Sequence, residues 1–424
     1  MTVSNKHRAI EAVWRIESAR LIAGLTRMVR DVGLAEELAQ DALVAALERW
    51  TESGIPDNPG AWLMATAKRR AIDELRRGKR VERKHEELGH ELESDQAHGA
   101  TPDLDAALDD EVGDDLLRLM FISCHPILST EARVALTLRL LGGLTTEEIA
   151  RAFLVPSTTV AQRIVRAKRT LSEEKVPFEL PRGEELASRL ASVLEVIYLV
   201  FNEGYSATAG DDWMRPELCA DALRLGRILA ELAPQEAEVH GLVALMEIQA
   251  SRSRARVGPK GQPVLLLEQN RALWDQLLIR RGLTALERAE KLGGAQGPYA
   301  LQAALAACHA RARRSEDTDW ARIASLYSVL VRLTPSPVVE LNRAVALSMA
   351  YGPAAGLAVV DTLTSEPSLA HYHLLPSVRG DLLRKLGRFD EARKEFEKAA
   401  GLTRNVREQT LLLDRAAACA RREA

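Results

Sequence analysis

Residues 144–169 read LTTEEIARAFLVPSTTVAQRIVRAKR and decide how the rest of the chain is interpreted. Apolar residues recur at helical spacing on both sides of Leu154-Val-Pro156, where proline stops the first helix. The residues expected to face a core are Ile149, Ala150, Phe153, Val160, Ile164 and Ala167. The pattern therefore predicts two helices joined by a tight turn.

Polar residues at the start of each helix support this prediction. Thr145 or Thr146 is expected to cap the first helix, with two glutamates in its first turn, where carboxylates interact favourably with the helix dipole. Ser157, Thr158 or Thr159 is expected to cap the second helix. Such caps would set the residue at which each helix begins.

The outward side of the second helix carries side chains that suit DNA. In a helix-turn-helix, the second helix enters the major groove, and its N-terminal half contacts base edges. The residues predicted to lie there are Ser157, Thr158, Thr159, Gln162, Arg163 and Arg166, with Lys168 and Arg169 beyond them at the phosphates. For this segment alone, a helical hairpin without a DNA function is an equally good interpretation.

A second basic helix is predicted between Pro59-Gly60 and Gly78. Its buried stripe recurs every four residues as Leu63, Ala67, Ala71 and Leu75. The row on its opposite side can follow a phosphate backbone and consists of Arg69, Asp73, Arg76, Arg77 and Arg80. Asp73 would orient a neighbouring arginine or accept a hydrogen bond from a base amino group. A solvated helix face is the alternative for this helix taken in isolation.

The helix expected before it, from Leu34 to Trp50, has an acidic outer face. Its core side is predicted to be Leu34, Leu38, Ala42, Ala46 and Trp50, whereas the outer side carries Glu37, Gln40, Asp41 and Glu48. Because carboxylates repel DNA, this face either docks a basic protein partner or is simply solvated.

The composition favours an all-α fold with several domains. A length of 424 residues exceeds one ordinary core, aromatic residues make up only 4%, and helix-favouring alanine, leucine, arginine and glutamate dominate. The formal net charge of -3 hides opposed local charges. A basic block at residues 68–84 is followed by residues 86–117, which contain acidic residues but no lysine or arginine.

Breaks in this pattern divide the chain into four zones. Two small helical modules are predicted at residues 8–80 and 113–175, joined by an acidic flexible linker at residues 81–112. After two further prolines, a helical domain is predicted to occupy residues 184–424.

The end of the last zone contains helix pairs that repeat. The small, small, aromatic and small positions of a tetratricopeptide unit are occupied by Gly380, Ala392, Phe396 and Ala399, and the preceding unit matches at Ala344, Gly356 and Val360. Helix pairs of this length bury their faces by stacking on one another. A generic helical bundle is the alternative.

The sequence contains no catalytic motif and no metal-ligand spacing, so we expect neither an enzyme nor a cofactor. The four cysteines are scattered, which favours buried thiols in a reducing compartment. The run from Phe201 to Ser206, followed by Gly210 to Asp212, suits a capped turn between helices or a ligand pocket. With no signal peptide or spanning segment recognised, a cytoplasmic protein without membrane contact is expected.

Three motifs in this order resemble bacterial RNA polymerase sigma factors of the extracytoplasmic-function (ECF) group, in the sigma-70 family. Residues 35–50, AEELAQDALVAALERW, resemble region 2.2, and residues 61–77, AWLMATAKRRAIDELRR, resemble regions 2.3 and 2.4. Residues 144–169 resemble region 4.2, whereas regions 1.1 and 3 have no counterpart, which is typical of the ECF group. Residues 193–206 and the terminal repeats resemble the ECF subgroup with a fused tetratricopeptide-like extension, although Tyr351 departs from that subgroup's pattern.

The resemblance implies a sigma factor that docks on core RNA polymerase and initiates transcription at specific promoters. Glu37, Gln40 and Asp41 would contact the clamp helices of the β′ subunit, and the second module would contact the β flap. Asn58 and Trp62 would capture unwound bases of the −10 element, which the first basic helix reads. The helix-turn-helix would read the −35 element. The C-terminal repeats would regulate the sigma factor in place of a separate anti-sigma factor, and would offer a surface to a protein partner.

A second class of function follows from the residues alone. A polymerase-independent helix-turn-helix regulator would bind duplex DNA as a symmetric dimer, and its helical C-terminal domain would sense a ligand or a protein. The acidic helix at residues 34–50 argues against this class, because a simple repressor needs no acidic docking helix beside a basic DNA helix.

Overall fold

The structure, a computed structural model, describes residues 3–87, 108–153, 155–206, 214–259, 261–403 and 405–420. These ranges are built from α-helices and short 3-10 helices and contain no strand, which confirms the predicted all-α class. The chain divides into two compact units, Met1–Val196 and Ile197–Ala424, with the boundary inside α8 (Glu184–Tyr205).

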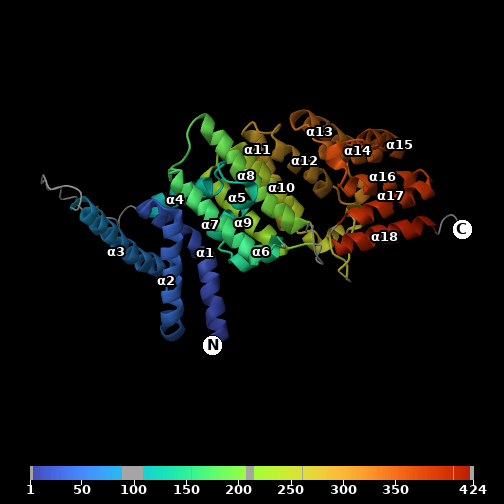
Figure 1. Cartoon of the computed structure of the whole chain (residues 1–424). Coiled ribbons are helices and arrows are strands. Elements are labelled where there is room, and N and C mark those ends of the chain that lie inside the picture. Colours follow the sequence, from blue (N-terminus) through green and yellow to red (C-terminus); the bar gives the residue numbers. More distant parts are fainter. Residues whose placement is uncertain are drawn as a thin grey trace. The chain divides into compact units, whose positions relative to one another are not determined.

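The first unit contains seven helices and the beginning of α8 (Figure 1). Their bounds are α1 (Val3–Val29), α2 (Val32–Ser53), α3 (Pro59–Glu87), α4 (Leu108–Ser123), α5 (Thr130–Leu140), α6 (Thr146–Phe153) and α7 (Ser157–Glu173).

Small residues bring α1, α2 and α3 close together. Ala42 and Ala46 on α2 are fully buried, as the apolar pattern predicts. Ala35 is also fully buried, whereas Leu34, predicted to face the core in its place, is half-buried. A Cβ atom added at Gly60 of α3 would lie 2.6 Å from a carboxylate oxygen of Glu17 on α1, so a larger residue there would displace that side chain. Small side chains therefore set the spacing of this three-helix module.

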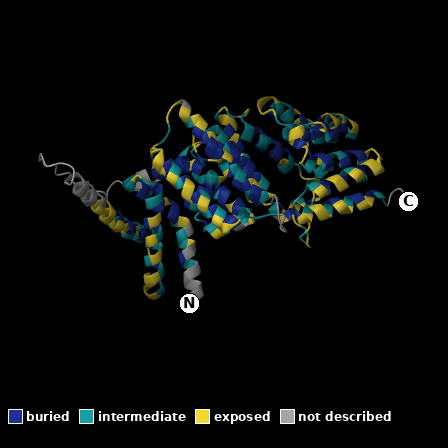
Figure 2. Ribbon diagram, in the orientation of Figure 1, coloured by how far each residue is buried: buried dark blue, intermediate teal, exposed yellow. Residues whose placement is uncertain are grey.

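The course of α3 differs from the prediction in two ways. The helix continues to Glu87, past Gly78, because one glycine costs only about 1 kcal/mol in a helix and its neighbours are good helix formers. The buried stripe ends at Ala71, and Leu75, predicted to be in the core, is 40% exposed. Figure 2 shows exposed residues along this later part of α3, where no neighbouring helix covers the apolar stripe.

The predicted acidic linker at residues 81–112 lies largely outside the described residues. Of the described part, residues 81–87 complete α3 and residues 108–112 begin α4. The flexible character predicted for this segment therefore stays a prediction.

The helices α4 to α7 form the second module of the first unit. α5 and α6 pack on α7, and the predicted core residues Val160, Ile164 and Ala167 are buried. α4 also packs on α1, where the guanidinium of Arg27 lies 3.2 Å from the buried carboxylate of Asp115. The two modules, predicted as separate bodies, thus meet within one compact unit.

The beginning of α8 also belongs to the first unit. Arg189 donates a hydrogen bond to the carbonyl of Phe121 at 3.1 Å, and the hydroxyl of Ser192 donates one to the carbonyl of Cys124 at 2.6 Å. These bonds tie the segment after the two prolines to α4.

The second unit consists of the end of α8 and ten further helices. Their bounds are α9 (Pro216–Leu232), α10 (Ala237–Ala250), α11 (Gln276–Lys291), α12 (Pro298–Arg311), α13 (Trp320–Leu333), α14 (Pro337–Tyr351), α15 (Pro353–Leu363), α16 (Leu374–Lys385), α17 (Phe389–Leu402) and α18 (Val406–Ala420). Each packs on its neighbour in the chain, with 3-10 turns between α10 and α11.

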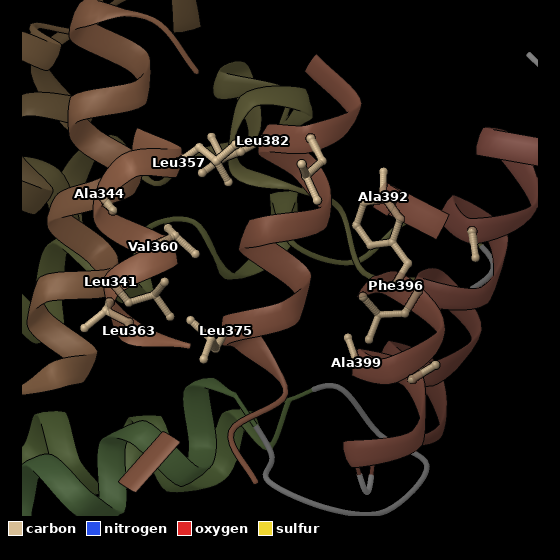
Figure 3. Close-up of a cluster of buried hydrophobic side chains, with 14 of the residues drawn as sticks. Leu341, Ala344, Leu357, Val360, Leu363, Leu375, Leu382, Ala392, Phe396 and Ala399 are labelled. Carbon is tan, nitrogen blue, oxygen red and sulfur yellow. The ribbon is translucent and has the colours of Figure 1, made fainter. Parts of the chain in front are cut away.

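The last helix pairs pack as tetratricopeptide-like repeats, as predicted. Figure 3 shows the cluster between α15 and α16 and around Phe396 of α17. Phe396 is fully buried, and a Cβ atom added at Gly380 would lie 3.0 Å from its ring. Gly356 likewise lies against Ala344, whose carbonyl oxygen would be 2.6 Å from an added Cβ atom. The small positions therefore exist to let helices approach.

The remaining sequence expectations concern cysteines and membranes. All four cysteines are free and buried. Within the described ranges, no helix has the length and apolar character that a bilayer crossing requires.

Replacing Gly356 with Ala should lower the free energy of unfolding by about 1–3 kcal/mol, because the added methyl group collides with the α14 backbone. The matched control is Gly401→Ala in α17, where an added Cβ atom meets nothing within 4 Å. That control should be neutral or stabilising, since alanine favours a helix over glycine. Urea unfolding of both variants checks the prediction, and equal effects would contradict it.

Candidate nucleic-acid interface

The basic row predicted on α3 is exposed. Arg69, Asp73, Arg76 and Arg77 all lie on the open part of the helix, and Arg77 makes a loose ion pair with Glu74, 3.4 Å between charged atoms. The side chain of Arg80, the last predicted member of the row, lies outside the described residues. An exposed row of guanidinium groups can replace condensed counterions along a phosphate backbone.

The start of α3 holds the two residues predicted to capture unpaired bases. The side-chain oxygen of Asn58 accepts a hydrogen bond from the backbone N–H of Ala61 at 3.0 Å, so Asn58 caps α3. The ring of Trp62 is half-buried and packs edge-on against Trp50, with ring centroids 5.1 Å apart. Sequence reasoning missed the cap, although an Asn-Pro pair before a helical stripe is its usual signature.

The two helices of the helix-turn-helix begin in different ways. The hydroxyl of Thr145 accepts a hydrogen bond from the backbone N–H of Glu148 at 3.1 Å, and the Glu148 carboxylate accepts one from the Thr145 N–H at 2.8 Å. This reciprocal capping box confirms Thr145 as the cap of α6. The predicted side-chain cap of α7 is wrong, because its N-cap is Pro156 and no side chain caps it.

Because no side chain caps α7, the polar side chains of its first turn are free to contact DNA. Ser157 and Thr158 are exposed, and Thr159 is half-buried. Further along, Gln162 and Arg166 are exposed and Arg163 is half-buried, so these predicted base-contacting side chains share one open face. Sequence reasoning missed Val165, which is 63% exposed on this helix. An exposed valine can contact a thymine methyl group.

Lys168 differs from the rest of the predicted DNA-contacting set. Its ammonium group forms an ion pair with Glu36 of α2, and only 20% of the side chain is exposed. The same carboxylate lies 2.5 Å from Nε of Arg139 on α5 and accepts a hydrogen bond from the amide of Gln40 at 2.6 Å. In this arrangement Lys168 points at a protein carboxylate and not at DNA. The sequence could not predict this pairing, because helical periodicity does not show that α2 lies beside α7.

Glu36 is ionised in this site. Burial raises the pKa of its carboxyl group, but Lys168 and Arg139 outweigh burial and hold the pKa below the ordinary value of 4.5. With Glu36 only 3% exposed, two cations share one buried anion at the junction of the two modules. We call Glu36, Arg139 and Lys168 the junction triad.

The predicted polymerase face of α2 is only partly free. Glu37 is exposed. Asp41 is exposed but lies 2.7 Å from a guanidinium nitrogen of Arg70 on α3, and Gln40 is engaged with Glu36. The outer face of α2 therefore remains acidic near Glu37 and is neutralised by α3 near Asp41.

Replacing Glu36 with Gln should lower the free energy of unfolding by about 1–3 kcal/mol at neutral pH, because the charge-assisted bonds to Arg139 and Lys168 are lost. The control Glu48→Gln changes an exposed carboxylate on the same helix and should shift stability by less than about 0.5 kcal/mol. If thermal and urea unfolding showed the same loss of unfolding free energy in both variants, the junction triad would not stabilise the fold.

The pH dependence of this difference follows from the lowered pKa. A carboxyl group whose pKa is depressed in the folded state contributes its full stability above the unfolded value, here 4.5. The difference between wild type and Glu36→Gln should therefore be constant from neutral pH to about 4.5 and shrink as pH falls through the folded pKa. A difference that grew on acidification would contradict the assigned charge.

Comparisons with known proteins agree with this geometry. Residues 16–81 match the family described as Sigma-70 region 2, and residues 118–171 match the family described as Sigma-70, region 4. Residues 189–290 match a family of unknown function, DUF6596. The first match runs from the middle of α1 into α3 and the second from within α4 to the last turn of α7, so both include the helices with the predicted DNA faces.

Relatives of two kinds are found. The uncharacterized protein R00370 of Rhizobium meliloti (strain 1021) is 44% identical over 388 residues, which cover 91% of this chain and 90% of that protein. The probable ECF RNA polymerase sigma factor SigI of Mycobacterium tuberculosis is 27% identical over 173 residues, 41% of this chain and 57% of that protein. The ECF RNA polymerase sigma factor SigK of Mycobacterium ulcerans (strain Agy99) is 30% identical over 158 residues, 36% of this chain and 78% of that protein. The chain therefore belongs to the ECF group of the sigma-70 family, and it carries a long tetratricopeptide-like extension beyond the two sigma regions.

Proposed function

We propose that this sigma factor directs core RNA polymerase to specific promoters, and that its C-terminal domain regulates that activity. The observation that carries the proposal is the pair of exposed basic faces on α3 and α7, each within a sigma-family match. Sigma factors are binding proteins, so this chain positions and opens DNA while the polymerase performs the chemistry. It would act in the cytoplasm, where core polymerase and promoter DNA are found.

Each DNA face has a distinct task in this proposal. Arg69, Arg76 and Arg77 of α3 follow the backbone of the −10 element, and Trp62 stacks with an unpaired base there. On α7, Gln162, Arg163 and Arg166 read base edges of the −35 element.

The polymerase contact is proposed for the acidic face of α2. Glu37 is its most open member, and it would meet basic residues on the clamp helices of the β′ subunit. Gln40 and Asp41 would join this contact only after exchanging their present partners, Glu36 and Arg70. The second module would then contact the β flap.

Reaching both promoter elements requires the two modules to separate. The −10 and −35 elements are named for positions roughly 25 base pairs apart, which is about 85 Å of B-form DNA at 3.4 Å per base pair. Modules packed on one another through α1 and α4 and through the junction triad cannot span that distance. We therefore propose that the triad opens when the holoenzyme binds a promoter, which frees Lys168 for a phosphate.

In vitro transcription with core RNA polymerase tests the proposed function. The full chain is compared with a chain ending at Val196, because the first compact unit includes the beginning of α8. Promoter-specific transcripts from either form support the sigma function, and the difference between the forms shows whether the extension restrains or assists it. Tight binding to duplex DNA alone, without core binding or transcripts, would instead establish a polymerase-independent regulator.

Replacing Arg163 with Ala should reduce discrimination between the correct and a mismatched −35 base by about 1–3 kcal/mol, because a base-contacting arginine is lost. Arg169→Ala is the matched control, since Arg169 lies further along the same helix, exposed and paired with Glu173. It should weaken holoenzyme binding equally on all sequences. Binding to promoter fragments with single base changes measures both effects, and a uniform loss in Arg163→Ala would make Arg163 a phosphate contact.

A further inference from the structure

The second unit contains a partly open cavity that the sigma function does not use. Its volume of about 460 Å³ is within the range of pockets that hold small molecules. Most of its lining residues come from α8, α10, α12, α13 and α14. All of its lining residues lie between Tyr198 and Ala346, inside one compact unit.

Aromatic side chains are concentrated around this cavity. The chain has only 18 Phe, Trp and Tyr residues, and five of them line it: Tyr198, Phe201, Tyr205, Trp320 and Tyr327. They come from α8 and α13, which approach the cavity from different parts of the sequence. Such walls suit a flat apolar body, because aromatic pairs gain from offset and edge-on contacts.

Polar groups stand at defined points of the wall. The hydroxyl of Tyr198 donates a hydrogen bond to the side-chain oxygen of Gln302 at 3.1 Å. The hydroxyl of Tyr327 has no hydrogen-bond partner among the described residues, and burial raises its pKa to about 12, so it is a donor at neutral pH. Asn342, exposed on α14, stands at the same cavity without a described partner.

A positive charge without a matching carboxylate lies at one end of the cavity. The guanidinium of Arg252 donates to the hydroxyl of Tyr205 and to the side-chain oxygen of Gln249, both through Nη2. Its carbon lies 5.7 Å from the centre of the Trp274 ring. Among the described residues, no carboxylate lies within ion-pair distance of Arg252, so its charge is compensated only by neutral groups.

A second guanidinium lies near Arg252. Arg271 is close enough for the two cations to repel, and it lies on the Trp274 ring, 4.8 Å from its centre. The carboxylates of Glu316 and Asp317 act on Arg271 and partly offset its charge, whereas Arg252 has no such partner. His309 is neutral at physiological pH, because burial, Arg252 and Arg271 lower its pKa to about 4. The imidazole packs edge-on against Trp320 at 5.1 Å. An arriving anion would therefore meet Arg252 as its charged partner and a neutral ring beside it.

We infer that this cavity binds a small aromatic carboxylate, with the carboxylate on Arg252 and the ring between the aromatic walls. Both hydrogens of Nη2 are committed to Tyr205 and Gln249, so the N–H donors of Nη1, which have no described partner, are the ones offered to a carboxylate. The cavity volume limits the ligand to one or two rings, and Tyr327 and Asn342 supply further hydrogen bonds. This inference concerns binding alone and does not rest on the promoter-binding proposal.

Titration calorimetry of the full chain with four probes tests the inference. Indole-3-acetate and 4-hydroxyphenylacetate combine a ring with a carboxylate, indole-3-acetamide keeps the ring and removes the charge, and acetate keeps only the charge. We expect both aromatic acids to bind, the amide to bind at least tenfold more weakly, and acetate not to bind. Equal binding of acid and amide, or no binding of either aromatic acid at millimolar concentration, would overturn the inference.

Two variants and a matched control locate the site. Arg252→Gln should weaken binding of indole-3-acetate at least tenfold, whereas Arg254→Gln, an exposed arginine two residues away that does not line the cavity, should leave it unchanged. Asn342→Trp fills the cavity from an exposed position and should abolish binding even if Arg252→Gln fails to fold. Unchanged binding in either folded variant would overturn the assignment of the cavity.

A peptide control separates the two sources of such a carboxylate. A short peptide ending in phenylalanine presents a ring and a free carboxylate at the end of a chain. Weaker binding of this peptide than of indole-3-acetate supports a small-molecule site. Binding at least tenfold tighter than that of the small acids would replace the inference with a dock for protein C-termini.

Discussion

The carboxylate of Glu36 is the charge on which the arrangement of the first unit depends. It comes from α2 of the first sigma module, is only 3% exposed, and meets Arg139 and Lys168 from the second module. A buried ion loses several kcal/mol of hydration, so it is tolerated only where opposite charges and hydrogen bonds replace water. Both modules therefore depend on the contact, because separating them must rehydrate three charges at once.

Such a contact is suited to a reversible interface. A buried ion pair contributes little net stability compared with an apolar contact, because its Coulombic gain is offset by desolvation. Polymerase and DNA carry charged groups that can replace the partners within the triad, and a DNA phosphate is the natural replacement for Glu36 at Lys168. The modules also meet where α4 packs on α1, around the ion pair of Arg27 with Asp115, and where the hydroxyl of Ser172 donates a hydrogen bond to Asp31 at 3.0 Å. The ionic part of the junction can thus exchange its partners, whereas separation of the modules must also expose the α1–α4 contact.

The second unit uses different physics. Its helices approach closely at Gly356, Gly380 and other small positions, and this stacking leaves a hollow lined by aromatic rings. Hollows in helical repeats are set by the curvature of the stack, so several successive helices contribute side chains to this one. A charge such as Arg252 can stand there without a carboxylate because tyrosine and amide oxygens accept its hydrogen bonds. The result is a site whose strongest unmet interaction is with an anion.

The sequence by itself determined the helices, the two basic faces, the helix-turn-helix and the terminal repeats. These features are carried by local periodicity and by small residues at regular spacing, which are visible without knowing the fold. It did not reveal that Lys168 turns toward Glu36, that α3 extends beyond its core at Ala71, or that Pro156 leaves α7 without a side-chain cap. Only the tertiary structure decided these points, together with the cavity beside Arg252, because each depends on groups far apart in the sequence or on the reach of neighbouring helices. A helical pattern shows which way a side chain points but not which residue it meets. Ion pairing and burial depend on that neighbouring residue, which only the tertiary structure supplies.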